Sequence, residues 1–221
     1  MAKTRSYKLL CPIARGLDRI GDRWTLLILR DLHAGPARFS ELQKGLTGIA
    51  ANLLTDRLVK LVADGLVSKG DGGHGASVYA LTELGARTSN IIFELAVFGA
   101  RFAPETEVVR PGNLRTVATT LGAAGQRVVT PDMAFRAALV VDGEEVELDV
   151  HDGTVRALYG PATDPDVVLT TSYQSLLGVT EGEISGEDFA TRHSQIDIRT
   201  PGKEVAFLSF MTAIVAMLAE A

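Results

Sequence analysis

The sequence is poor in cysteine and in aromatic residues. It has one cysteine and one tryptophan, and aromatic residues make up 6% of its 221 positions. A single cysteine excludes an intramolecular disulfide, which fits a reducing compartment. No apolar run reaches the roughly 18 residues that a bilayer span needs, so we expect no membrane insertion. The first residues are too few and too polar for a signal peptide, and we expect a cytoplasmic protein.

Motifs that carry catalysis or hold cofactors are also missing. The chain has no G-x-S-x-G elbow, no P-loop and no G-x-G-x-x-G motif placed between a strand and a helix. Its four histidines lack neighbours at metal-ligand spacing; they are His33, His74, His151 and His193. We therefore expect no enzyme activity, no bound metal and no cofactor.

Charge is divided unevenly along the chain. Residues 1–103 carry 14 lysines and arginines against nine acidic residues, whereas residues 104–221 carry eight against 18. A basic first half suits binding to phosphates, and DNA would repel an acidic second half. The alternative is that both surfaces are simply solvated.

The first half shows four helical patterns followed by two short strands. Pro12 suits the first turn of a helix, and a second apolar face runs from Trp24 to Leu32. Ser40 and Gln43 have capping-box spacing, so a short helix should begin near Ser40. After a turn, the next helix should bury its inward positions, which are Leu54, Leu58, Leu61 and Val62. Strands over 66–69 and 77–81, joined by a glycine-rich loop, complete the pattern of a winged helix-turn-helix.

Motifs throughout this region occur in the order typical of one protein family. They are Cys11-Pro12, Gly21-Asp22-Arg23-Trp24, Leu26-Leu27-Ile28-Leu29-Arg30, Arg38-Phe39-Ser40-Glu41-Leu42, Leu54-Thr55-Asp56-Arg57-Leu58, Asp64-Gly65-Leu66-Val67 and Leu81-Thr82-Glu83-Leu84-Gly85. Up to about Phe102 the chain resembles the HxlR family of bacterial transcriptional regulators. The resemblance implies a homodimer that binds double-stranded operator DNA. Ala50 departs from the family pattern, which has a helix-capping serine there, because alanine cannot cap.

The predicted DNA contacts lie on the second helix of the motif, at its flanks and on the wing. Asn52 can pair with adenine, Thr55 can reach a base edge, and Lys60 suits a phosphate. Asp56 either accepts from cytosine or pairs with an arginine, and Arg57 either reaches phosphate or braces the motif. A solvated helix face is the alternative for all of them. The full candidate set is Arg38, Ser40, Ala51, Asn52, Thr55, Asp56, Arg57, Lys60, Lys69 and His74.

A long apolar stripe follows Thr82, and exposed stripes of this kind mark interfaces. HxlR-like proteins dimerise through helices at the ends of this region, so the resemblance assigns the stripe to a dimer. Its residues are Ile91, Ile92, Leu95, Phe98 and Phe102. The alternative is packing against a second domain. Cys11 lies at a helix start near basic residues, where a thiolate is favoured, and it is a candidate for redox control.

We expect three segments: a DNA-binding and dimerisation domain over 1–103, a linker over 104–112 and a second domain over 113–221. The second domain should begin with a helix over 113–124 and end with an apolar helix over 204–219. Its strands are predicted at 133–141, 144–150, 154–159, 167–171 and 195–199, and Asp-Gly pairs between the first three predict hairpins. Further helices are predicted at 172–179 and 186–191. This is an α+β fold with a mainly antiparallel five-stranded sheet and helices on one face.

Residues 112–221 resemble the sterol carrier protein-type lipid-binding domain. The likeness rests on the strand-DG-strand-DG-strand run, DPDVVLTTSYQSLLGVTEGEIS, IDIRTPG and the closing apolar helix. It implies a tunnel for an acyl or sterol-like ligand, with Tyr173, Gln174 or Arg136 at a polar head group. The candidate lining residues are Phe135, Leu139, Leu158, Leu169, Tyr173, Leu176, Leu177, Phe207, Phe210, Met211 and Ile214. The expected function is therefore a ligand-sensing dimeric regulator. The alternatives are a second domain that is structural, dimerising or lipid-carrying, and a redox signal through Cys11.

Overall fold

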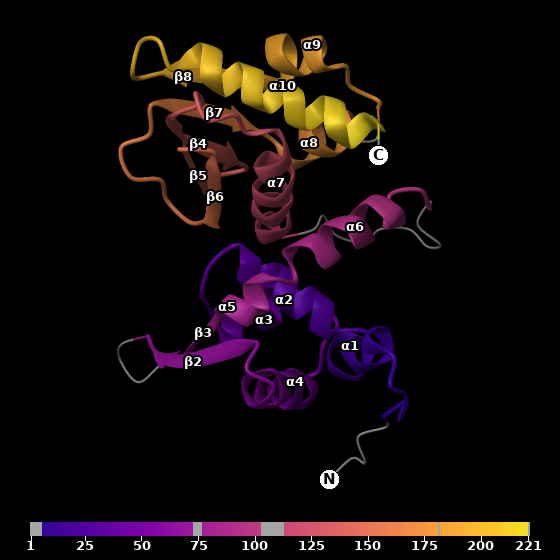
Figure 1. Ribbon diagram of the computed structural model, residues 1–221. Helices are drawn as coiled ribbons and strands as arrows, with labels where there is room; N and C mark the ends of the chain where they lie inside the picture. Colours follow the sequence, from indigo (N-terminus) through magenta and orange to yellow (C-terminus); the bar gives the residue numbers. More distant parts are fainter. Residues whose placement is uncertain (1–5, 73–76, 103–112, 181, 221) are drawn as a thin grey trace. The chain divides into compact units, whose positions relative to one another are not determined.

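The computed structural model describes residues 6–72, 77–102, 113–180 and 182–220 (Figure 1). The chain divides into two compact units, Met1–Ile92 and Phe93–Ala221. This division falls inside a helix, ahead of the linker expected over 104–112, which lies outside the described residues. The predicted domain boundaries therefore stay a prediction, and each unit is described by itself.

The first unit is a helical bundle with a small antiparallel sheet, whose strand order is β1-β3-β2. Its elements are α1 (Pro12–Ile20), α2 (Thr25–His33), β1 (Ala37–Arg38), α3 (Phe39–Gly45), α4 (Ala51–Ala63), β2 (Val67–Asp71), β3 (Ser77–Leu81), α5 (Glu83–Ala86) and α6 (Ser89–Gly99), the last of which continues into the second unit. The four helices predicted before the wing and both wing strands are confirmed, whereas the long apolar stripe after Thr82 is divided between two helices, α5 and α6. β1 was not predicted, because two residues are too few to show an alternating pattern.

A single apolar core holds α2, α3 and α4 together. Leu29 of α2, Leu42 of α3 and Leu54 of α4 are fully buried in it, and Leu58 and Leu61 extend the contact along α4. The three buried leucines of α4 are three or four residues apart, so they lie on one side of the helix. Val62 was predicted to face this core, but it is exposed, because it lies one position round the helix from Leu61.

The start of α3 differs from the capping prediction, whereas the start of α4 agrees with it. In α3 the carboxylate of Glu41 accepts a hydrogen bond of 2.6 Å from the backbone N–H of Arg38, so the helix begins at Phe39. The predicted pair of Ser40 and Gln43 is therefore wrong. At the start of α4, Ala50 forms no side-chain cap, because a methyl group cannot accept a hydrogen bond. The Leu54 N–H donates to the Ala50 carbonyl.

The second unit is an α+β layer with a five-stranded sheet of order β6-β5-β4-β7-β8. Its elements are α7 (Leu114–Val128), β4 (Phe135–Val141), β5 (Glu144–His151), β6 (Thr154–Tyr159), β7 (Val167–Thr171), α8 (Tyr173–Thr180), α9 (Gly186–Asp188), the π-helical turn η1 (Phe189–His193), β8 (Ser194–Ile198) and α10 (Glu204–Glu220). All neighbouring strands are antiparallel except β4 and β7. The mainly antiparallel five-stranded sheet is thus confirmed.

Two Asp-Gly pairs form the hairpin turns between β4, β5 and β6. Asp142 and Gly143 have φ of 49° and 85°, and Asp152 and Gly153 have φ of 50° and 69°. Positive φ at both central positions matches the right-handed twist of paired strands, and the Asp-Gly sequence tolerates it. This local chemistry explains why the hairpins could be predicted.

Both long helices of the second unit pack on the same face of the sheet. Phe135 of β4 contacts Phe207 and Phe210 of α10, while Gly125 of α7 lies against Phe210 and Val155 of β6. Phe135 pairs with Val150, and Val150 with Val155, so these strand residues share one face. The prediction of helices on one face agrees with these contacts. No helix within the described ranges is both long and apolar enough to cross a bilayer.

Candidate functional site

The outer face of α4 carries exposed polar side chains opposite its buried leucines. Ala51, Asn52, Thr55 and Asp56 are all exposed, and Val59 continues the same face. The Thr55 hydroxyl donates to the Ala51 carbonyl at 2.9 Å, and the Asn52 Oδ1 accepts from the Leu53 N–H at 2.9 Å. The amide hydrogens of Asn52 and the acceptor lone pairs of Thr55 remain for an outside partner.

Asp22 joins the start of α2 to the middle of α4. Its carboxylate accepts from the backbone N–H of Trp24 at 3.0 Å and of Thr25 at 3.2 Å, and from the Thr25 hydroxyl. It also forms an ion pair of 2.9 Å with the Nε of Arg57. Burial raises the pKa of Asp22, but the hydrogen bonds from Thr25 and Trp24 and the positive charge of Arg57 outweigh burial and lower the pKa overall. Arg57 therefore braces the motif, one of the two roles expected for it.

The C-terminal half of α4 is tied to α1 by two further contacts. The Lys60 ammonium donates to the Asp18 carbonyl at 2.7 Å, and Arg19 forms an ion pair of 2.8 Å with Asp64. Lys60 is half-buried in this arrangement. The structure thus gives Lys60 an internal contact where a phosphate contact was expected. Sequence reasoning missed the pair of Arg19 and Asp64, because nothing in the spacing of these residues links α1 to the end of α4.

The remaining DNA-contact candidates flank α4 or lie on the wing. Arg38 and Ser40 are exposed at the start of α3, and Lys69 is exposed on β2, with its ammonium 6.0 Å from the ring centre of Tyr79. Lys44 of α3 is also exposed, and it is a further candidate for a phosphate contact that sequence reasoning did not name. His74 lies outside the described residues.

Within the described residues, Asp56 does not form the ion pair with an arginine that was one of its two expected contacts. It is exposed on α4, and no arginine in the described part of the chain forms an ion pair with it. An exposed carboxylate on this face would repel phosphate but could accept from the amino group of cytosine. Of the two roles expected for Asp56, contact with cytosine is the one that remains a prediction.

The predicted dimer stripe, which runs along α6 and ends at Phe102 just after it, is exposed at all but one of its positions. Leu95 is 49% exposed and Phe98 is 60% exposed, and Ile91 and Phe102 are exposed as well. Phe98 and Phe102 pack against each other with ring centres 5.1 Å apart. Ile92 was predicted to belong to the exposed stripe, but it is buried, because it packs into the apolar core cluster of the first unit.

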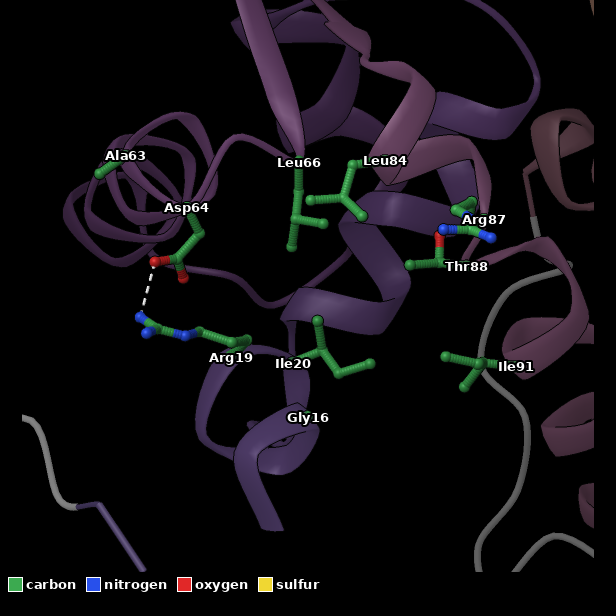
Figure 2. Close-up of a pocket in the computed structure, with 10 residues that line it drawn as sticks. All are labelled: Gly16, Arg19, Ile20, Ala63, Asp64, Leu66, Leu84, Arg87, Thr88 and Ile91. Carbon is green, nitrogen blue, oxygen red and sulfur yellow. Dashed lines mark hydrogen bonds and ion pairs between the residues drawn. The ribbon is translucent and has the colours of Figure 1, made fainter. Parts of the chain in front are cut away.

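A pocket of about 550 Å³ opens in the first unit between α1, the end of α4, and α5 with the start of α6 (Figure 2). Arg19 and Asp64 lie at one side of it, and Arg87, Thr88 and Ile91 lie at the other. Its apolar lining consists of Ile20, Ala63, Leu66, Leu84 and Ile91. Nothing in the sequence patterns pointed to this pocket, because its lining comes from four separate elements.

The candidate ligand-lining residues of the second unit are mostly core residues. Phe135 lies edge-on to Phe207 and Phe210, with ring centres 5.6 and 5.5 Å apart, and all three rings are buried. Leu139, Leu169 and Ile214 are buried too, while Tyr173, Leu176 and Met211 are half-buried.

Three of the residues expected around this ligand lie elsewhere. Leu158 pairs with Glu147 on the sheet face opposite the helices, and Arg136 pairs with Asp149 on that same face. Alternation along the strands explains both, since Phe135 and Ala157 next to them face the helices. Leu177 is exposed on α8.

Cys11 is a free, exposed cysteine at the residue that precedes α1. It makes no side-chain capping hydrogen bond there. Its proposed redox role stays a prediction.

The first half of the chain matches known proteins. A model of the HxlR-like helix-turn-helix family matches residues 19–107. The HTH-type transcriptional regulator YkvN of Bacillus subtilis is 33% identical over 115 residues, which are 48% of this chain and 98% of YkvN. Rv3095 of Mycobacterium tuberculosis, of the same description, is 36% identical over 97 residues, 43% of this chain, and the chain spans 61% of its length.

A solved structure, quinone-bound YodB from B. subtilis, is 28% identical and covers 42% of this chain and 100% of YodB, with a TM-score of 0.38. The family model stops at residue 107, so residues 113–221 lie outside it. Because almost the whole of YkvN aligns at 33% identity, this chain belongs to the HxlR-like helix-turn-helix family.

Proposed function

We propose that the protein is a dimeric transcriptional regulator that binds operator DNA through the outer face of α4. The observation that carries this proposal is the geometry of α4. Its leucines anchor one side in the core, and Asn52 and Thr55 are exposed on the other. An α-helix presented in this way fits the major groove, where asparagine and threonine can read base edges.

The braces around α4 support the same function. Asp22 fixes its middle through Arg57, and Asp18 and Arg19 of α1 fix its end through Lys60 and Asp64. A helix that reads bases must keep its register, and such contacts hold it relative to α1 and α2. The basic surplus of residues 1–103 supplies the general attraction to phosphate.

A titration with fluorescent DNA from upstream of the protein's own gene tests the DNA-binding part. The anisotropy should rise to saturation near physiological salt and should resist an excess of unrelated DNA of equal length. Specific binding is typically at least about 1,000-fold tighter than non-specific binding. Equal competition by the unrelated DNA, repeated with fragments that tile the neighbouring genes, would contradict operator recognition.

The exposed stripe on α6 supports a second copy of this chain as partner. Leu95 and Phe98 leave large apolar surfaces in water on a helix whose first half is anchored by the buried Ile92 and Phe93. A dimer covers such surfaces and would present two α4 helices to half-sites about one helical turn apart.

The dimer is tested with Leu95→Glu and a matched control. The control is Leu208→Glu on α10, because Leu208 is also exposed, at 43%. Light scattering after size exclusion should show a dimer for wild type and for Leu208→Glu, and a monomer for Leu95→Glu. A monomeric wild type, or a dimer that survives Leu95→Glu, would contradict this interface.

The second unit has one candidate role that its packing favours, a structural module. The rings of Phe135, Phe207 and Phe210 occupy the space between sheet and helices and contact one another there. The predicted acyl or sterol-like ligand would have to displace them. Mass spectrometry of lipids extracted from the purified chain separates the two roles. A stoichiometric lipid would support sensing or carrying, and no stoichiometric lipid would support the structural role.

A further inference from the structure

The pocket of the first unit has a polar group at each side and an apolar middle. Figure 2 shows Arg19 and Asp64 at one side, Arg87 with Thr88 at the other, and Ile20, Leu66 and Leu84 between them. Binding sites for small molecules have this composition, with an apolar lining and a few polar groups that fix orientation. The volume of about 550 Å³ lies within the range of such sites.

Asp64 brings an unsatisfied acceptor to the pocket. Its Oδ1 pairs with Arg19 at 2.8 Å, but its Oδ2 is buried and has no hydrogen-bond partner among the residues that the structure describes. A buried carboxylate oxygen without a donor is costly, and such groups are normally satisfied by a partner. A ligand hydroxyl reaches this buried oxygen when the Asp64 side chain turns towards the pocket, and the hydrogen bond that it then donates to Oδ2 would remove this cost.

Arg87 brings a cation to the other side of the pocket. It is exposed, and within the described residues it forms no ion pair. The lining thus holds two arginines and one carboxylate, and the carboxylate is already paired with Arg19. The surplus positive charge at Arg87 suits an anion, and a guanidinium binds a carboxylate through two parallel hydrogen bonds.

We propose that this pocket binds a small carboxylate whose apolar chain ends in a hydroxyl group. The carboxylate pairs with Arg87, the chain lies along Ile20, Leu66 and Leu84, and the hydroxyl donates to Asp64. This proposal rests on the proposed function in one respect, since it makes the ligand an effector of DNA binding. Ala63 is the last residue of α4 and Asp64 its cap, so an occupant fixes the end of α4 against α1 and α5.

Calorimetry with the full chain tests the site itself. The probes are ω-hydroxyhexanoate, ω-hydroxyoctanoate and ω-hydroxydecanoate, which vary the distance between carboxylate and hydroxyl. At least one should bind saturably, with one molecule per chain. Saturable binding by none of the three would overturn the proposal.

Matched arginine variants then locate the probe. Arg87→Met should weaken binding at least about tenfold, the usual worth of a charge-assisted hydrogen bond. The control is Arg15→Met, because Arg15 is an exposed arginine of α1 outside the pocket, and this variant should bind as wild type does. Equal affinities of the two variants would place the probe elsewhere and overturn the proposal.

The contact between the ligand hydroxyl and Asp64 is tested by comparing probes with and without a hydroxyl group, in wild type and in Asp64→Ala. Octanoate, which lacks the hydroxyl, should bind wild type at least about fivefold more weakly than ω-hydroxyoctanoate. In Asp64→Ala, checked for folding by circular dichroism, the two probes should bind equally. A hydroxyl advantage that persists in Asp64→Ala would overturn the assignment of that oxygen.

Regulation is read separately, from operator affinity. A saturating probe should change the affinity for operator DNA by at least about fivefold, a typical coupling between sites. An unchanged affinity would overturn the effector role alone. A chain that binds the probe but no DNA would contradict the proposed function, and a chain that binds DNA but no probe would contradict only this inference.

Discussion

Asp22 shows how one residue can couple two helices of the motif. Its carboxylate holds the first turn of α2 through Trp24 and Thr25, and it holds α4 through Arg57. The sequence showed Asp22 only as part of a motif, because its partner on α4 lies 35 positions away.

Replacing Asp22 with alanine should destabilise the protein. The variant loses the hydrogen bonds at the start of α2 and leaves Arg57 half-buried without its carboxylate, which we expect to cost about 2 kcal/mol. Denaturant unfolding measures the change, with Asp56→Ala as the control, because Asp56 is exposed and has no ion pair in the described part of the chain. An Asp22→Ala variant as stable as Asp56→Ala would contradict the bracing role.

His33 makes a second residue-scale contact with a consequence for pH. The Thr88 hydroxyl donates to the Gly85 carbonyl at 2.7 Å, so it accepts from the Nε2–H of His33 at 2.9 Å. Burial lowers the pKa of His33 below its ordinary value of 6.5, which means the folded protein holds this side chain neutral.

Stability should therefore fall on acidification, because the unfolded chain takes up this proton first. The contribution of His33 is complete above pH 6.5 and is lost as the pH falls below 6.5 towards the lowered pKa of the folded state. Melting temperatures between about pH 7.5 and 5.5 measure it. The decline should be shallower in His33→Gln than in wild type, and an equal decline would rule out His33 as its source.

At the scale of elements, local patterns were sufficient for most strands and helices. β6 and β7 have the predicted bounds. An Asp-Gly turn marks the start of β6, and each of the two strands coincides with an apolar run. The parallel pairing of β4 with β7 could not be predicted, because it depends on a contact between segments 30 residues apart. The N-cap of α3 was also missed. Whether Ser40 or Arg38 occupies that position depends on the backbone conformation of β1, which ends at Arg38.

Helix α7 offers a matched pair of glycines for a packing test. A Cβ at Gly125 would lie 2.5 Å from the Cζ of Phe210, a ring that is fully buried, whereas a Cβ at Gly122 would lie 3.4 Å from the Cβ of Ala157. Alanine raises helix propensity by about 1 kcal/mol at either position, so the difference between them reports the packing.

Gly125→Ala should lower the free energy of unfolding by about 1–3 kcal/mol, and Gly122→Ala should leave it equal or higher. Chemical denaturation of both variants measures this. Equal stabilities would mean that the space around Phe210 is loose enough to hold additional atoms, which would favour a ligand cavity in the second unit.

At the scale of the whole molecule, the uneven charge predicts how DNA binding depends on salt. Arg38 is exposed beside the motif, whereas the ammonium of Lys60 is committed to the Asp18 carbonyl. The sequence could not separate these two cations, because both occupy positions that suit phosphate. Only the fold shows that one of them faces inward.

Arg38→Ala should therefore reduce the slope of log affinity against log salt by about 0.9, the value for one phosphate contact. Lys60→Ala should leave the slope unchanged and instead lower the melting temperature. Anisotropy titrations across a salt series measure the slopes. A reduced slope in Lys60→Ala would return Lys60 to the phosphate interface.

The central claim is that the outer face of α4 reads bases in the major groove. The most direct measurement is a scan of every base pair of the operator, performed with wild type and with Asn52→Ala. Wild type should lose about 1–3 kcal/mol of binding at each contacted position, and Asn52→Ala should become indifferent to one A·T pair while keeping its other preferences. Unchanged preferences at every position in Asn52→Ala would contradict the account.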